Sequence, residues 1–231
     1  MKTISKRRQQ ANQKLETKLY TPEEGIQLLK ETATAKFIES AEAHVSLNID
    51  PKYSDQQLRT TLILPKGTGK TKRIAVLIAN EKITPELEEL ADIVGSDSLI
   101  DSMTKGELDF DILIATPDMM PKLAKLGRVL GPKGLMPSPK AGTVTTDITA
   151  ALSEFKRGKI EYRADKTGIV HLSFGKANFT VEDLSSNLLS VYNSIEQNKP
   201  SGVKGRYFKT FYICSTMGPS IAIDFTGFKT K

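Results

Sequence analysis

The sequence predicts two domains of different class: an α+β domain whose antiparallel sheet is formed by both termini, and an inserted three-layer α/β domain with a mostly parallel sheet. In the terminal thirds of the 231-residue chain, apolar and polar residues alternate as in half-buried strands. In the middle third, continuous apolar strands alternate with helical segments, as in βαβ units. Glycines stand at both junctions, so residues 67–159 are predicted to be inserted between 1–66 and 160–231.

The first terminal segment is predicted to contain one helix and two strands. Residues 21–24 can form a capping box, with Pro22 at the first helical position, which predicts a helix that begins there. Residues 40–50 alternate and predict a half-buried strand. Residues 59–64 are predicted to be the hairpin partner of that strand.

The inserted segment is predicted to alternate strands with helices. Its strands are expected at residues 74–79, 93–94 and 111–115. Its helices are expected near residues 85–90, 119–126 and 148–156. Asp147 precedes the last helix and can cap it by accepting a hydrogen bond from the first turn. Strands and helices in this order predict a largely parallel sheet.

The second terminal segment is again predicted to be antiparallel. Its strands are expected at residues 160–163, 169–174, 206–216 and 220–225. A hairpin-like turn at residues 165–168 joins the first two strands, and Met217-Gly218-Pro219 joins the last two. A helix that begins at residue 180 and reaches about Gln197 lies between the two pairs. The two ends of the chain therefore resemble each other and are predicted to form one domain.

Charge is unevenly distributed along the chain. The net charge is +6, from 33 basic and 27 acidic residues. Residues 1–18 carry six basic residues against one acidic residue, and residues 119–146 carry five basic residues and no acidic one. Each run fits either a solvated surface or a surface for a phosphate-bearing partner. No apolar stretch approaches the roughly 18 residues of a membrane span, and the polar N-terminus predicts that no secretory signal is present.

Few residues indicate catalysis, a cofactor or a metal. Residues 67–71 lack the first glycine of a phosphate-binding loop, because Leu64 stands in its place. The two histidines, His44 and His171, are far apart in the sequence and are predicted to be packed or hydrogen-bonded rather than metal ligands. Cys214, the single cysteine, lies in an apolar run and is predicted to be a core residue. The sequence therefore predicts no catalytic residue, no cofactor and no metal site.

Several long motifs resemble one protein family over nearly the whole chain. Residues 110–137 closely resemble the conserved segment of the ribosomal protein L-one family, the stalk protein of the large ribosomal subunit. Residues 34–37, 165–168 and 216–220 are similar to the same family. The resemblance implies a non-enzymatic protein that binds large-subunit ribosomal RNA and helps to move transfer RNA out of the exit site. It also implies repression of its own messenger RNA, as in bacterial relatives, and no homo-oligomer.

The resemblance also implies which residues contact RNA. The candidates are Lys36, Phe37, Ser40, Lys166, His171, Ser173, Thr216, Met217, Gly218, Pro219 and Ser220. Folded RNA is recognised largely through shape, sugar hydroxyls and phosphates, which suits short polar side chains and open backbone on a rigid turn. Residues 216–220 supply hydroxyls, a glycine, a proline and a methionine, although an ordinary turn between strands is the alternative.

Two further sets of residues are predicted in and beside the inserted domain. A basic loop that holds Arg128, Lys133 and Lys140 is either a secondary contact with ribosomal or transfer RNA or a purely structural connection. Gly67, Gly69 and Gly158 are predicted to form a two-strand hinge.

The source and the rival functions are also predicted from the sequence. Residues 50–61 and 201–207 look most similar to the cyanobacterial and plastid branch, and only 8 of the 33 basic residues are arginine. A plastid ribosome, in the chloroplast stroma, is therefore expected, with the bacterial cytoplasm as the alternative. The rival functions are a translational repressor that is free of the ribosome and a nucleotide-dependent enzyme that uses the α/β domain. The incomplete phosphate-loop motif disfavours the enzyme.

Overall fold

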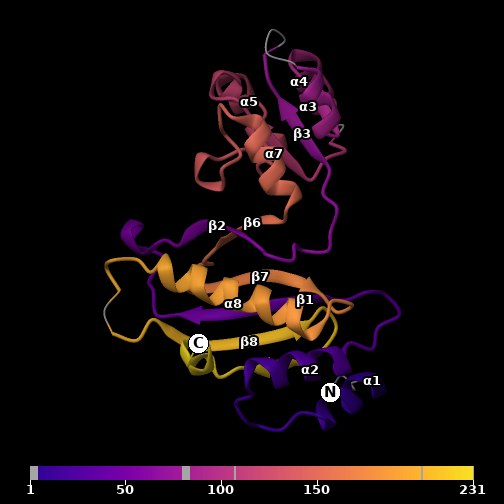
Figure 1. Ribbon diagram of the computed structural model, residues 1–231. Helices are drawn as coiled ribbons and strands as arrows, with labels where there is room; N and C mark the ends of the chain where they lie inside the picture. The colour runs from indigo at the N-terminus through magenta and orange to yellow at the C-terminus, as the bar shows by residue number, and fades with distance from the viewer. Residues whose placement is uncertain (1–4, 80–83, 107, 204, 231) are drawn as a thin grey trace. The chain divides into compact units, whose positions relative to one another are not determined.

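The computed structural model describes residues 5–79, 84–106, 108–203 and 205–230. The chain forms two compact units: Met1–Gly69 with Ile160–Lys231, and Lys70–Lys159. The first unit holds an antiparallel sheet and the second a parallel one (Figure 1). The predicted fold class is therefore confirmed. The predicted hinge residues Gly67 and Gly69 lie in the first unit and not in the second.

The first unit is built on a four-stranded antiparallel sheet in the order β7-β1-β8-β9. Its strands are β1 (Ser40–Leu47), β7 (Ile169–Lys176), β8 (Phe208–Ser215) and β9 (Ser220–Ala222). β1 comes from the N-terminal segment and pairs along both edges with strands of the C-terminal segment. The sheet therefore needs both ends of the chain.

Two helices, α2 (Pro22–Thr32) and α8 (Val181–Gln197), pack against one face of this sheet (Figure 1). α2 begins with the predicted capping box, in which the Glu24 amide donates to Thr21 Oγ1 at 3.4 Å and the Thr21 amide donates to Glu24 Oε2 at 3.2 Å. α8 begins after Thr180, as predicted. The remaining helices of the unit are α1 (Lys6–Gln13), η1 (Ser54–Gln56) and η5 (Phe225–Thr230).

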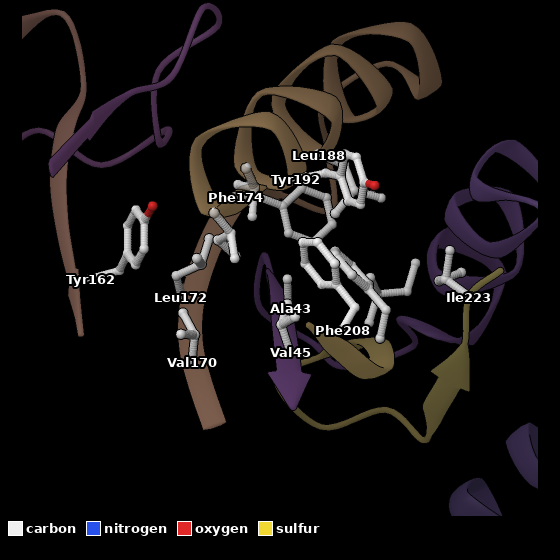
Figure 2. Packing of buried hydrophobic residues seen from close by; sticks show 14 of the residues in the cluster. Ala43, Val45, Tyr162, Val170, Leu172, Phe174, Leu188, Tyr192, Phe208 and Ile223 are labelled. Atoms are coloured by element: carbon white, nitrogen blue, oxygen red, sulfur yellow. The ribbon is translucent and has the colours of Figure 1, made fainter. Parts of the chain in front are cut away.

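The core of the first unit lies between the sheet and these helices. Ala43 and Val45 of β1 are fully buried there. Figure 2 shows Leu188 and Tyr192 of α8 close to Phe208 of β8, and the rings of Tyr192 and Phe208 stack with their centroids 4.9 Å apart. Because successive side chains of a strand point to opposite faces, the polar neighbours of these core residues lie on the other face of the sheet.

The pairing of two strands differs from the prediction. β2 (Arg59–Ile63) pairs with β6 (Lys159–Arg163) in a separate two-stranded sheet, and it is not the hairpin partner of β1. The physical reason is that β7 and β8 occupy both edges of β1. The turn at 165–168 does form, with the Gly168 amide donating to the Asp165 carbonyl at 3.1 Å. However, the strands on either side of this turn belong to different sheets.

The second unit is a parallel sheet with helices on both faces. Its strands, in the order β4-β3-β5, are β3 (Ile74–Leu77), β4 (Ile93–Gly95) and β5 (Ile112–Ala115). One face packs against α3 (Pro85–Leu90) and α7 (Ile148–Lys156). The other face packs against α4 (Asp97–Lys105) and α5 (Met120–Ala124). Asp147 caps α7 as predicted, accepting from the Ala150 amide at 3.1 Å.

Some helices of the second unit differ from the prediction. α4 was not predicted, although Leu99, Ile100 and Met103 have helical spacing, because its serine, aspartate and threonine residues are also typical of turns. The helix predicted near 119–126 is confirmed in shorter form, because α5 ends at Ala124, and separate short pieces precede and follow it. These pieces and the last short helix are η3 (Pro117–Met119), α5, α6 (Gly127–Leu130) and η4 (Pro139–Ala141). Among the helices that the structure describes, none is both long and apolar enough to cross a membrane.

A buried asparagine of α8 holds the first connection to the inserted segment. Asn187 is fully buried, and its side chain accepts from the Lys66 amide at 3.0 Å. It donates to the carbonyls of Gly67 at 3.1 Å and Phe174 at 2.8 Å. Gly69 has a positive φ of 69°, and a Cβ at this position would lie 2.8 Å from the side chain of Lys176. The chain is therefore fixed to the first unit as far as Gly69.

Candidate RNA-binding surface

The face of the four-stranded sheet opposite α2 and α8 carries polar side chains, and we call it the open face. Its residues include Glu42 and His44 of β1, His171 and Ser173 of β7, Tyr212 and Cys214 of β8, and Ser220 of β9. Three of the predicted RNA-contact residues, His171, Ser173 and Ser220, are among them. Two strands that are not adjacent in the sequence, β7 and β9, thus bring these three predicted residues to one face.

The turn between β8 and β9, residues 216–220, lies beside the start of β1, and we call it the recognition turn. The Thr216 amide donates to the Ser40 carbonyl at 3.1 Å. The Ser40 amide donates to Thr216 Oγ1 at 2.9 Å, and the hydroxyl of Thr216 lies 3.4 Å from the Ser40 carbonyl. Three of the predicted residues, Ser40, Thr216 and Met217, are therefore brought together, and Thr216 and Met217 are exposed.

The carboxylate of Glu39 holds this turn in place. The Met217 amide donates to Glu39 Oε2 and the Ala35 amide donates to Glu39 Oε1, both at 2.9 Å. Arg7 adds an ion pair to Glu39 at 3.9 Å and donates to the Met217 carbonyl at 3.3 Å. One side chain therefore connects the recognition turn with the segment that precedes β1.

Glu39 is buried and yet charged. Its side chain is 1% exposed, and this burial acts to raise its pKa. The amides of Met217 and Ala35 and the charge of Arg7 act in the opposite direction and prevail, so the pKa of Glu39 lies below its ordinary value. Glu39 is therefore an anion at neutral pH and a strong hydrogen-bond acceptor.

Gly218 is required by close packing within the turn. A Cβ at this position would lie 2.3 Å from Ser215 Oγ, which is shorter than any normal contact. The Gly218 amide donates to the Ser215 carbonyl at 3.0 Å, and Pro219 behind it is buried. The glycine and the proline thus shape a compact turn, as expected from the sequence.

Exposed apolar side chains surround the recognition turn. Phe37, Ile38 and Met217 are 55%, 58% and 50% exposed, and Lys36 beside them is also exposed. Phe37 and Ile38 precede Glu39 directly, and Met217 is tied to the same carboxylate. Exposed rings and thioethers of this kind can stack on unpaired nucleotide bases.

Other predicted residues lie apart from the recognition turn. Lys166 is exposed in the turn that contacts the far end of β1, where the Leu47 amide donates to the Gly168 carbonyl at 3.0 Å. Leu47 lies seven positions along the strand from Ser40, which is roughly 23 Å. The basic residues of the loop in the second unit are exposed and belong to the other compact unit: Arg128, Lys133 and Lys140.

The structure corrects the core prediction for Cys214, and it shows both histidines hydrogen-bonded, as predicted. Cys214 is half-buried on the open face, because its neighbour Ile213 takes the core side of β8. His44 Nε2 lies 3.2 Å from Cys214 Sγ, and His44 Nδ1 lies 2.8 Å from His171 Nδ1. The sequence predicted no ligand cluster because these residues are far apart in the chain. The register of the sheet nevertheless places them side by side.

The structure also adds residues that the sequence did not predict for this surface. Glu42, His44 and Tyr212 lie on the open face, and the alternation of residues 40–47 could have placed the first two there. Glu39 had no such signal, because an isolated glutamate before a strand looks like a surface charge. Only its contacts with the distant Met217 reveal its role.

Known proteins are similar to this chain over nearly its whole length. Residues 29–219 match the model of the "Ribosomal protein L1p/L10e family", which is the L-one family of the sequence analysis. The chain is 62% identical to the large ribosomal subunit protein uL1c of Guillardia theta over 100% of this chain and 99% of that protein. It is 61% identical to uL1c of Trieres chinensis (97% and 98%) and 59% identical to large ribosomal subunit protein uL1 of Thermosynechococcus vestitus (97% and 94%).

Proposed function

The chain belongs to the ribosomal protein L-one family of large-subunit structural proteins, and on this basis we propose that it binds ribosomal RNA directly through the recognition turn and the open face. In this proposal it forms the mobile stalk and assists the release of transfer RNA from the exit site. Membership of a family of ribosomal proteins also means that the chain is not an enzyme.

The observation that carries the proposal is the rigid presentation of exposed groups on the recognition turn. Thr216 and Met217 are exposed, yet the backbone that carries them is held by the buried carboxylate of Glu39 and by Ser40. A surface that is ordered before binding loses little conformational entropy when RNA arrives. Hydroxyls and backbone held in this way suit RNA, which is recognised by shape and by its sugar hydroxyls.

Crosslinking in cells, followed by identification of the bound RNA, tests the proposal. We expect crosslinks to large-subunit ribosomal RNA that map to residues 36–40 and 216–220, and sedimentation of the protein with large subunits. Crosslinks to messenger RNA alone, with no sedimentation with large subunits, would instead support a free repressor. The proposal includes repression of its own messenger RNA, because the same surface would bind either the ribosomal RNA or the messenger RNA.

The first unit is predicted to bind RNA without the inserted one. Residues 1–69 joined to 160–231 by a short linker should fold, because this unit has its own core and includes the recognition turn. We expect it to keep most of the affinity of the whole chain for ribosomal RNA in a binding titration. Tight binding by residues 70–159 alone, with none by the folded first unit, would place the site elsewhere.

The exposed lysines of the inserted unit are predicted to contribute salt-sensitive affinity only. Each phosphate neutralised adds about 0.7–0.9 to the slope of log affinity against log salt. Replacing Lys133 and Lys140 by glutamine should therefore reduce the slope by about 1.4–1.8 and leave discrimination against unrelated RNA nearly unchanged. Replacing Lys105 and Lys156, which are exposed elsewhere in the same unit, is the control and should change the slope little. Lost discrimination with an unchanged slope would contradict the prediction.

We also propose that the protein acts in a plastid ribosome of the chloroplast. The relatives from Guillardia theta and Trieres chinensis carry the name uL1c, and a cyanobacterial relative is nearly as similar. Fractionation of plastids should then recover the protein with the large ribosomal subunit of the stroma. Recovery with ribosomes outside the plastid would contradict this location.

A further inference from the structure

Three side chains with metal-binding atoms meet near the centre of the open face. Glu42 and His44 follow each other on the same face of β1, and Glu42 pairs across strands with Cys214 of β8. A carboxylate oxygen, an imidazole nitrogen and the thiol sulfur of these three residues all lie within 4.8 Å of one another. All three residues are half-buried, so the cluster is partly shielded from water but open to a small ion.

The distances within this cluster match the coordination shell of zinc. His44 Nε2 lies 3.2 Å from Cys214 Sγ and 3.9 Å from Glu42 Oε2. A tetrahedral Zn²⁺ with bonds of about 2.0–2.3 Å separates its ligand atoms by about 3.3–3.7 Å. The two separations lie on either side of that range, so small side-chain rotations would complete the geometry. The backbone of two paired strands already holds the three side chains in register.

A second histidine supports the orientation of the first. His44 Nδ1 lies 2.8 Å from His171 Nδ1, so one ring donates to the other. If His44 Nδ1 donates to His171 Nδ1, then His44 Nε2 carries a lone pair that points to the cluster. His171 then carries its proton on Nε2, which lies 3.8 Å from Asp165 Oδ2. A ligating histidine usually donates its other ring N–H to a partner of this kind, which fixes its tautomer.

We propose that Glu42, His44 and Cys214 form a binding site for one Zn²⁺ ion, with water as the fourth ligand. The set of sulfur, nitrogen and oxygen ligands favours zinc over Mg²⁺ and Ca²⁺, which prefer all-oxygen shells. Binding replaces the thiol proton of Cys214: the S–H bond breaks, a Zn–S bond forms, and one proton is released to solvent. Asp165 and His171 orient the ligand His44 without touching the metal.

The protonation state of free His44 suits this site, whereas the thiol of Cys214 must lose its proton on binding. Burial and the neighbouring His171 lower the pKa of His44, so its imidazole is neutral at pH 7 and able to ligate. Burial and Glu42 raise the pKa of the Cys214 thiol, so the free protein carries a thiol that can donate to His44. The alternative to a metal site is therefore an ordinary Cys–His hydrogen bond, and the experiment below distinguishes the two.

The test titrates the full-length chain, free of any affinity tag and fully reduced, with Zn²⁺ and with Co²⁺. We expect one Zn²⁺ per chain by equilibrium dialysis, and with Co²⁺ the intense ultraviolet absorption of a thiolate–cobalt bond. Cys214→Ser should lose that absorption and weaken Zn²⁺ binding by more than the roughly 10–100-fold that is typical when a hydrogen-bond partner of a ligand is removed. His171→Ala should keep the absorption and weaken binding by about 10–100-fold.

The control is Ser46→Ala, which alters the open face on the same strand without removing a ligand. It should bind Zn²⁺ as the unmodified chain does, and thermal unfolding of every variant verifies that each is folded. Equal Zn²⁺ affinity in a folded Cys214→Ser variant, or no thiolate–cobalt absorption in the unmodified chain, would overturn the site. The titrations contain no RNA, so this inference and the proposed RNA binding can fail separately.

Discussion

Replacing Glu39 by glutamine is expected to weaken RNA binding about tenfold or more and to lower the free energy of unfolding by about 1.5–3 kcal/mol. The carboxylate accepts from the amides of Ala35 and Met217 through different oxygens. A glutamine side chain offers one oxygen and one NH₂ group, so one of these amides would face another donor. The recognition turn would lose its fixed position, and RNA would bind only the fraction of molecules in which the turn is correctly placed.

The control for this variant is Glu31→Gln, because Glu31 is an exposed glutamate whose ion pair with Lys14 should contribute about 0–1 kcal/mol. RNA titration and chemical denaturation of both variants measure the two effects. Unchanged RNA affinity in Glu39→Gln, with Glu31→Gln also unchanged, would remove the role assigned to Glu39.

The same carboxylate gives a pH dependence with a defined sign. The folded-state pKa of Glu39 is lower than the ordinary value of 4.5, so its contribution to stability is present above pH 4.5. The contribution is lost as the pH falls through the lower folded-state pKa. Acid should therefore destabilise the unmodified chain more than the Glu39→Gln variant.

Replacing Thr216 by valine is expected to weaken RNA affinity by one to two decades. Valine keeps the β-branched shape but removes a hydroxyl that can bond the sugar hydroxyl of RNA. An unsatisfied polar group at a dry interface costs about 1–3 kcal/mol, which corresponds to this loss of affinity. The variant should also be less stable without RNA, because the buried amide of Ser40 donates to the same hydroxyl at 2.9 Å.

Two further variants separate binding from stability. Thr216→Ser retains the hydroxyl and should recover most of the affinity. Thr71→Val changes an exposed threonine of the inserted unit and should change neither property much. RNA titration and thermal unfolding of the three variants provide the comparison. Full affinity in a folded Thr216→Val variant would show that its hydroxyl does not contact RNA.

The sequence predicted the elements of the fold better than their pairing. The capping box of α2, the cap of α7 and the start of α8 depend on residues within one turn, and all three were correct. The partner of β2 was predicted from nearness in the sequence and was wrong, because β7 and β8 occupy both edges of β1. Local hydrogen bonds are encoded by neighbouring residues, whereas strand order depends on contacts across more than a hundred residues.

The same distinction applies to the candidate surface. The segments 36–40 and 216–220 meet at Ser40, Thr216 and Met217, but these residues were predicted from resemblance to a family and not from periodicity. Glu39, which binds the two segments together, could not be predicted, since its partner Met217 is 178 residues away. The cluster around His44 was missed for a similar reason: His171 is 127 positions distant and becomes a neighbour only through strand pairing.

The pairing of β1 has a consequence for the order in which the protein matures during synthesis. β1 leaves the ribosome early, but its partners on both edges, β7 and β8, are made only after the inserted unit. The inserted unit can therefore fold first. Until β7 and β8 are made, both edges of β1 remain unpaired, and unpaired edges favour aggregation. Ser40 and Glu39 meet Thr216 and Met217 only after β8 has been synthesised. A chain truncated before residue 216 would lack the recognition turn and, with it, the surface proposed to bind RNA.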